Sequence, residues 1–180
     1  LLSFVPQKTD LETDFTAEEI VMTGRTPYQG RFLGTSVNDK EAVSRAFSLT
    51  KANRLKDKKF AILSGGEKQK IVIARAVAQT TPWMLLDEPI ASLDIKNQIE
   101  IMQTLLELNR QEGVSVLMVL HDINLAGIYC DRLIMLKDGQ VIAAGNTNEC
   151  LCEENLKKLY DISFFHMDTK KGQRYYYAEI

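Results

Sequence analysis

Two adjacent carboxylates, Asp87 and Glu88, follow a short apolar run that begins after Pro82. The run at 83–86 predicts a buried strand of a parallel sheet, which would deliver both carboxylates at its C-terminal end. Ligands of open α/β sheets bind at that end of the strands. One carboxylate can hold Mg²⁺, mostly through water, while its neighbour acts as a base on an attacking water. The pair therefore predicts hydrolytic chemistry assisted by a divalent cation.

A second chemical feature is the sequence Ser64-Gly65-Gly66-Glu67, which leads into a helix-forming run that extends to Ala78. Ser64 and Glu67 have the spacing of a capping box, so we expect a helix to begin here. The glycines would let the backbone adopt positive φ angles and approach a ligand closely. Free N–H groups at a helix N-terminus attract anions such as phosphate. Taken alone, the segment also fits an ordinary capped helix that binds nothing.

Four motifs in this order resemble those of ABC-type ATPases. The sequence LSGGEKQ at 63–69 is similar to the signature, LLDEP at 85–89 to the Walker B motif, and Ser92-Leu93-Asp94 to the D-loop. His121, at the end of a second apolar run, is similar to the H-loop residue. The resemblance covers nearly the whole chain. MTGRTPY at 22–28 and the segment 121–145 resemble one branch, the importers of iron–siderophore complexes, haem and cobalamin.

The resemblance implies ATP and Mg²⁺ as cofactors and assigns roles to particular residues. Asp87 and Gln7 would serve Mg²⁺, and Glu88 would polarise the attacking water. His121 would contact the γ-phosphate, and Gln7 would also link the site to a permease. Two subunits would meet head to tail and sandwich two ATP molecules. Ser64 and Gly66 are expected to face the nucleotide of the other subunit, and the full set of residues expected to bind nucleotide is Ser64, Gly65, Gly66, Glu67 and Asp94.

The implied fold is the α/β C-terminal part of a P-loop NTPase (RecA-like) core with a mainly parallel sheet, together with an α-helical signature subdomain. We expect a core strand and Q-loop at 1–8, a helical subdomain at 9–80, a core part at 81–146, and C-terminal helices and a hairpin at 147–180. The P-loop pattern G-x-x-x-x-G-K-[ST] does not occur in the sequence. The P-loop is therefore expected outside this chain, which we expect to be inactive alone.

Helix caps and periodicity predict the remaining helices. Capping boxes at 16–19 and 38–41 predict two short helices, the second with Asn38 as its N-cap. Asp94 predicts the N-cap of a longer helix that ends at Gly113. The apolar stripes expected on the last two helices are Ala42, Val43, Ala46 and Leu49, and Ile95, Ile99, Met102 and Leu106.

Strands are expected at 1–5 and 114–120, both buried, and Trp83 is expected in the core. Two antiparallel hairpins are expected at 133–144 and 164–178, with one or two helices between them. In the second hairpin, Tyr175 to Tyr177 favour a half-buried strand over base stacking.

The composition is that of a soluble globular protein, with 45% apolar and 26% charged residues. A net charge of −2 does not favour a nucleic-acid partner. No apolar run approaches the roughly 20 residues that span a bilayer. Cys130, Cys150 and Cys152 are typical of reduced thiols. A metal site formed by Cys150, Cys152 and His166 would lack a fourth ligand.

The resulting hypothesis is a fragment of the ATP-binding and hydrolysing subunit that powers import of an iron chelate, haem or cobalamin at the cytoplasmic face of the cell membrane. Its partners would be a second ATPase subunit, transmembrane permease subunits and, indirectly, a substrate-binding protein. The segment 9–59 is expected to dock on the permease, with Tyr28, Phe32 and Leu33 either forming the docking groove or filling the small core of the helical subdomain. The alternatives are an inactive interaction module and an SMC or DNA-repair ATPase. The latter is disfavoured because no heptad array separates Gln7 from Leu63.

Overall fold

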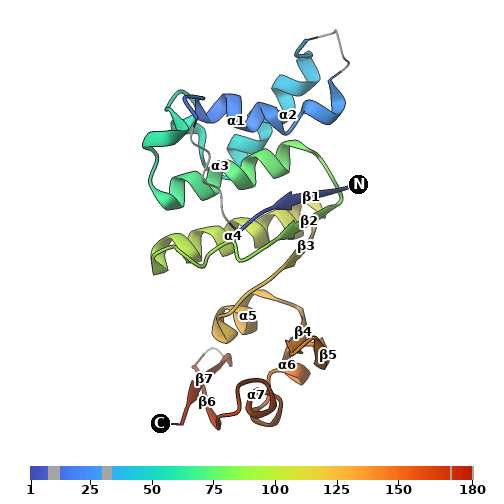
Figure 1. Ribbon diagram of the computed structural model, residues 1–180, viewed down its shortest axis with the longest axis vertical. Coiled ribbons are helices and arrows are strands. Elements are labelled where there is room, and N and C mark those ends of the chain that lie inside the picture. Colours follow the sequence, from blue (N-terminus) through green and yellow to red (C-terminus); the bar gives the residue numbers. More distant parts are fainter. Residues whose placement is uncertain (8–12, 30–33, 171, 180) are drawn as a thin grey trace. The chain divides into compact units, whose positions relative to one another are not determined.

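The computed structural model describes residues 1–7, 13–29, 34–170 and 172–179. It divides the chain into two compact units, Leu1–Val119 and Leu120–Ile180, and each is described by itself (Figure 1). The four segments expected from the sequence stay a prediction.

The first unit contains a parallel three-stranded sheet. Its strands are β1 (Leu2–Val5), β2 (Trp83–Leu86) and β3 (Ser115–Met118), in the order β1-β2-β3. The ladder extends past the strand ends, because the Asp87 N–H donates to the Val5 carbonyl at 2.9 Å. The predicted parallel strands are thus confirmed, and β1 and β2 end side by side.

Seven helical elements accompany this sheet in the described part of the first unit. Four are α-helices: α1 (Ala17–Thr23), α2 (Val37–Leu49), α3 (Gly65–Ala78) and α4 (Ile95–Glu112). Three are 3₁₀ turns: η1 (Thr26–Tyr28), η2 (Asn53–Leu55) and η3 (Phe60–Ile62). Helices α1 and α2 pack against α3 and form a helical layer with it (Figure 1).

Only one face of the sheet is well buried, which corrects the expectation of strands buried on both faces. Val5, Met84 and Leu86 lie on the buried face. Trp83 is 56% exposed and is not a core residue, contrary to the expectation. Successive side chains of a strand point to opposite faces, and the strands are in register, so Trp83 shares the exposed face with Phe4.

The start of α2 differs from the prediction. Its N-cap is Ser36, whose Oγ accepts the Asp39 N–H at 3.1 Å while the Asp39 carboxylate accepts the Ser36 N–H at 3.0 Å. Asn38 lies inside the helix and does not cap it. The deciding contact is tertiary, because Asp39 also forms a buried ion pair with Arg25 at 2.9 Å.

Helix α4 begins after Asp94 and ends at Gly113, as predicted, and Gly113 has the left-handed φ of +68°. Of the predicted stripe, Met102 is buried at 1% exposure, as expected, but Ile95 is 76% exposed and Ile99 is 37% exposed. The side chains that α4 buries most completely are Ile101, Met102, Leu105 and Leu108. The two sets share Met102 and both have helical spacing, so periodicity alone could not fix the exact centre of the buried face.

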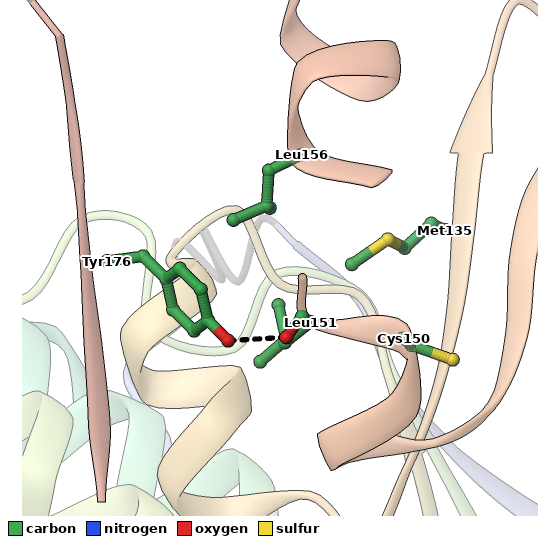
Figure 2. Packing of buried hydrophobic residues seen from close by; sticks show 5 residues of the cluster. All are labelled: Met135, Cys150, Leu151, Leu156 and Tyr176. Carbon is green, nitrogen blue, oxygen red and sulfur yellow. Dashed lines mark hydrogen bonds between the residues drawn. The ribbon is translucent and has the colours of Figure 1, made fainter. Parts of the chain in front are cut away.

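The second unit combines two hairpins with three short helices. The hairpins are β4 (Arg132–Lys137) with β5 (Gln140–Asn146) and β6 (Phe164–Asp168) with β7 (Arg174–Ala178), and the helices are α5 (Ile123–Tyr129), α6 (Thr147–Cys150) and α7 (Glu153–Tyr160). Both predicted hairpins and the two helices between them are confirmed. Figure 2 shows the buried cluster that holds this unit together: Met135, Cys150, Leu151, Leu156 and Tyr176.

Candidate active site

Gln7 and Glu88 meet at the C-terminal edge of the parallel sheet. Because β1 and β2 are parallel neighbours, the residues that follow them emerge at the same edge. The Gln7 side-chain amide donates from Nε2 to Glu88 Oε2 at 2.7 Å. Asp87 lies beside this pair and is fixed by its backbone bond to Val5. The tertiary structure thereby joins residues 81 positions apart in the sequence.

The backbone at Glu88 is unusual. Its φ of +45° is in the left-handed region, where a residue other than glycine costs roughly 1–3 kcal/mol. Pro89 follows, and a residue before proline normally prefers an extended conformation. Strained conformations of this kind gather at functional sites, because the surrounding structure must hold them in place. The turn directs the Glu88 carboxylate toward Gln7.

The N-terminus of α3 has the predicted capping box. Glu67 Oε2 accepts hydrogen bonds from the backbone N–H and the hydroxyl of Ser64, both at 3.0 Å. The backbone bond from Ser64, followed by the hydroxyl bond, holds the pKa of Glu67 below its ordinary value. The Glu67 carboxylate is therefore occupied within its own helix end, which positions the Ser64 hydroxyl.

Gly65 and Gly66 have different surroundings. Neither has a positive φ, which corrects the expectation of a left-handed glycine loop, because both residues already belong to the first turn of α3. A Cβ on Gly66 would lie 2.4 Å from Cγ of Asn97, whereas one on Gly65 would lie 3.8 Å from Leu93 Cδ2. Gly66 is buried and is required by packing within the chain. Gly65 is exposed and leaves room for an approaching group.

Asp94 caps α4 as predicted, and Asn97 supports it. Asp94 accepts the backbone N–H of Asn97 at 2.9 Å and its side-chain amide at 2.8 Å, and these bonds lower the pKa of Asp94. Asn97 also lies against Gly66, so it connects the start of α3 with the start of α4. Gln98 braces the preceding turn by donating to the Leu93 carbonyl at 3.0 Å. The sequence analysis missed both side chains, although the spacing of Asp94 and Asn97 is that of a cap.

The start of α3 suits an anion. In the part of the chain that the structure describes, the N–H groups of Gly65 and Gly66 have no hydrogen-bond partner. Such groups at a helix N-terminus, together with the helix dipole, favour phosphate. The Ser64 hydroxyl lies beside them.

The residues at the sheet edge are better suited to Mg²⁺ bound together with a nucleotide than to a metal ion whose ligands all come from the protein. Among the described residues, no group of three or more His, Cys, Asp and Glu side chains is placed to hold a metal. Mg²⁺ bound with a nucleotide needs only one or two protein carboxylates, with water and phosphate as the other ligands. Asp87, with Gln7 nearby, can meet that demand. In the second unit, His166 Nδ1 pairs with Glu153 at 2.8 Å and Cys150 is buried.

His121 belongs to the second unit and is described by itself. It is exposed and immediately precedes Asp122, the N-cap of α5. Asp122 Oδ1 accepts the backbone N–H groups of Asn124 at 2.8 Å and Leu125 at 2.9 Å. The cap therefore fixes the backbone directly after His121.

The sequence profile of the family described as ABC transporter matches residues 1–91. The chain belongs to the ABC transporter family. The ferric enterobactin transport ATP-binding protein FepC of Escherichia coli (strain K12) is 37% identical to this ABC protein over 167 residues, which are 93% of the chain and 62% of FepC. The chain thus spans less than two thirds of that relative.

Solved structures of ABC proteins share the fold. A metal-chelate type ABC transporter in an inward-facing conformation has a TM-score of 0.93 at 26% identity, covering 99% of this chain and 73% of that one. A dimeric ATP-binding cassette in a post-hydrolysis state with ADP and Pi has a TM-score of 0.67 at 34% identity, covering 81% and 62%. The predicted fold class, an α/β P-loop NTPase core with a helical subdomain, is confirmed. In the described part of this ABC chain, no helix is long and apolar enough to cross a membrane.

Proposed function

We propose that the chain is part of a subunit that binds and hydrolyses ATP to power the import of a metal chelate. The observation that carries this proposal is the contact between Gln7 Nε2 and Glu88 Oε2 at 2.7 Å. It places a carboxylate, on a strained turn, at the edge of a parallel sheet where ligands of such folds bind. Membership of the ABC transporter family supports nucleotide binding at this edge.

We assign to Glu88 the role of polarising the attacking water. A positioned carboxylate that takes a proton from water contributes about 10²–10⁴-fold to a rate. Gln7 donates from Nε2 to Glu88 Oε2 at 2.7 Å, which holds the carboxylate at the C-terminal edge of the sheet. We assign Mg²⁺ to Asp87 and Gln7; the ion would neutralise negative charge on the phosphates when bound. His121 is assigned to the γ-phosphate.

The starts of α3 and α4 would face the nucleotide of a second subunit. The N–H groups of Gly65 and Gly66 and the Ser64 hydroxyl supply donors for phosphate oxygens. Asp94 would hold the neighbouring turn in place through Asn97. Glu67 is assigned to the positioning of Ser64, because its carboxylate is engaged in the helix cap. Such an arrangement stabilises transferring phosphate only when the two subunits are closed.

The import substrate is inferred from the relatives. FepC is named for ferric enterobactin transport, and the structural neighbour is described as metal-chelate type. A siderophore-bound ferric ion is therefore the first candidate, with haem and cobalamin next. Uptake of each compound by cells that carry the complete transporter would distinguish them.

The partners of the complete protein would be a second ATPase subunit, permease subunits and, indirectly, a substrate-binding protein, at the cytoplasmic face of the membrane. Tyr28 remains our candidate for the permease contact, since the residue is 45% exposed. The Arg25 guanidinium lies 3.9 Å from its centre, and its hydroxyl donates to the Gln79 carbonyl at 2.6 Å. These contacts hold the ring rigidly at the surface. Phe32 and Leu33 lie outside the described residues.

Glu88→Gln in the complete subunit tests the proposed function. We expect turnover to fall by about 10²–10⁴-fold, while ATP stays bound and the closed dimer accumulates in gel filtration. Glu18→Gln, an exposed carboxamide substitution in α1, is the matched control and should hydrolyse ATP normally. Parental turnover in Glu88→Gln would contradict the assignment. The 180-residue chain alone should not turn over ATP, because it contains no P-loop sequence.

A further inference from the structure

The side chain of Asn124, in the first turn of α5, forms two hydrogen bonds with the backbone of one residue in β7. Its Nδ2 donates to the Tyr176 carbonyl at 3.0 Å, and its Oδ1 accepts the Tyr176 N–H at 2.8 Å. The two residues are 52 positions apart, and α5 packs against β7. The contact lies entirely within the second unit.

The geometry of β7 explains why an amide side chain is suited to this place. In an antiparallel pair, the N–H and C=O of one residue point to the same side of the strand. At Tyr176 both groups point to the outer edge of the β6–β7 hairpin, where Asn124 receives them. An asparagine supplies one donor and one acceptor in a single plane, whereas aspartate supplies acceptors alone.

Both ends of this contact are anchored. Tyr176 is 5% exposed, and its hydroxyl donates to the Leu151 carbonyl within the buried cluster (Figure 2). On the other side, the backbone N–H of Asn124 donates to the Asp122 cap at 2.8 Å. His121 is the residue directly before that cap. A continuous path of hydrogen bonds thus runs from the core of the second unit to the backbone next to His121.

We propose that Asn124 is a positioning residue for His121, which it holds by fixing the first turn of α5 to β7. The inference rests on the proposed function, in which His121 contacts the γ-phosphate. Asn124 itself touches neither substrate nor reacting atoms. It acts by restricting the backbone at 121–124, so that the imidazole need not be ordered anew in each cycle.

The first test compares Asn124→Ala with Asn155→Ala in the complete subunit. Asn155 is a matched control, since its amide also donates to a backbone carbonyl of the same unit, that of Cys150 at 3.0 Å, but its partner lies in α6 and not in β7. A misplacement of about 1 Å in a site can cost about 100-fold in rate. We expect kcat to fall at least tenfold in Asn124→Ala with KM for ATP little changed, and to be normal in Asn155→Ala. Asn124→Asp, which keeps one bond, should be intermediate.

A double mutant separates positioning from loss of stability. If Asn124 acts through His121, adding Asn124→Ala to His121→Ala should lower kcat no further. A multiplicative loss would overturn the proposal. Parental kcat in Asn124→Ala would overturn it too, and would leave the proposed function intact. Absence of turnover in the wild-type complete subunit would instead overturn the proposed function itself.

Hydrogen exchange supplies a readout that does not depend on turnover. Loss of the two hydrogen bonds between the Asn124 side chain and the Tyr176 backbone makes local opening of the helix start easier. Amide exchange at 123–126 should therefore rise about tenfold in Asn124→Ala, but not in Asn155→Ala. Unchanged exchange at these residues would show that Asn124 does not restrain the turn, and the proposal would fall.

Discussion

Replacing Gly65 and Gly66 by alanine, one at a time, should separate the chemistry of this segment from its packing. The two positions are adjacent, and both belong to the first turn of α3. The structure nevertheless gives them opposite surroundings. Opposite results are therefore expected from the same chemical change.

Gly65→Ala should fold normally. Its new Cβ would lie 3.8 Å from Leu93 Cδ2, which is an ordinary van der Waals contact. Alanine is favoured over glycine in the middle of a helix by roughly 0.5–1 kcal/mol, which is an upper bound at this first helical position, so the melting temperature should be unchanged or raised by no more than about 2–4 °C. ATP hydrolysis should fall at least tenfold, because the methyl group occupies the place where phosphate of the other subunit would approach.

Gly66→Ala should destabilise the protein. Its Cβ would lie 2.4 Å from both Cγ and Oδ1 of Asn97, so the Asn97 side chain must rotate and give up its bond to Asp94. Overpacking of this kind costs about 1–3 kcal/mol and should lower the melting temperature by several degrees. In a double variant with Asn97→Ala, which removes the obstructing atoms, the two losses should not add.

On the complete subunit, thermal melting followed by circular dichroism measures the stability of each variant, and steady-state assays measure its ATP turnover. Parental turnover in Gly65→Ala would refute the assignment of Gly65 to the nucleotide of the other subunit. A loss of stability in Gly65→Ala as large as that in Gly66→Ala would refute the packing argument. Additive losses in the Gly66→Ala and Asn97→Ala pair would show that the two side chains do not interact.

Two further predictions follow from the helix starts. Ser64→Arg in the complete subunit should leave ATP binding by the monomer intact but abolish the hydrolysis that requires the dimer. If a binding assay and a turnover assay showed equal losses, the assignment of Ser64 to the nucleotide of the other subunit would be wrong. Ser36→Ala should lower the free energy of unfolding by about 1 kcal/mol, whereas Asn38→Ala should stay within about 0.5 kcal/mol. Hydrogen bonds from the Ser36 side chain, then from Arg25, hold the pKa of Asp39 below its ordinary value. This contribution is present above about pH 4 and is lost as the pH falls through the lowered pKa, so Ser36→Ala should weaken the acid dependence of melting.

The local elements were predictable because their causes are local. Thr16, Ser64 and Asp94 each accept a backbone N–H from the third residue that follows, which requires only a short stretch of chain. The turn at Asp138-Gly139 was predictable for the same reason, since both residues have left-handed φ angles and glycine favours them. The order of these motifs also sufficed to identify the family.

The tertiary structure decided which face of each element is buried and which residue caps α2. Trp83 and Ile95 are apolar and well spaced, yet they are exposed, because burial depends on what the rest of the chain covers. Ser36 displaced Asn38 as the cap because Arg25 holds Asp39 from another helix end. Such choices require contacts between residues that are distant in sequence.

The candidate site also combines features that the sequence determines with features that depend on the tertiary structure. The sequence by itself determined which residue types stand at the strand ends and helix starts, because motif spacing and capping chemistry are properties of short segments. Only the tertiary structure joined Gln7 to Glu88, set Gly66 against Asn97, and tied Asn124 to Tyr176. These pairs are separated by many residues, and no local pattern encodes them. Their geometry follows from the register of the parallel sheet, the packing of α3 on α4, and the outer edge of β7.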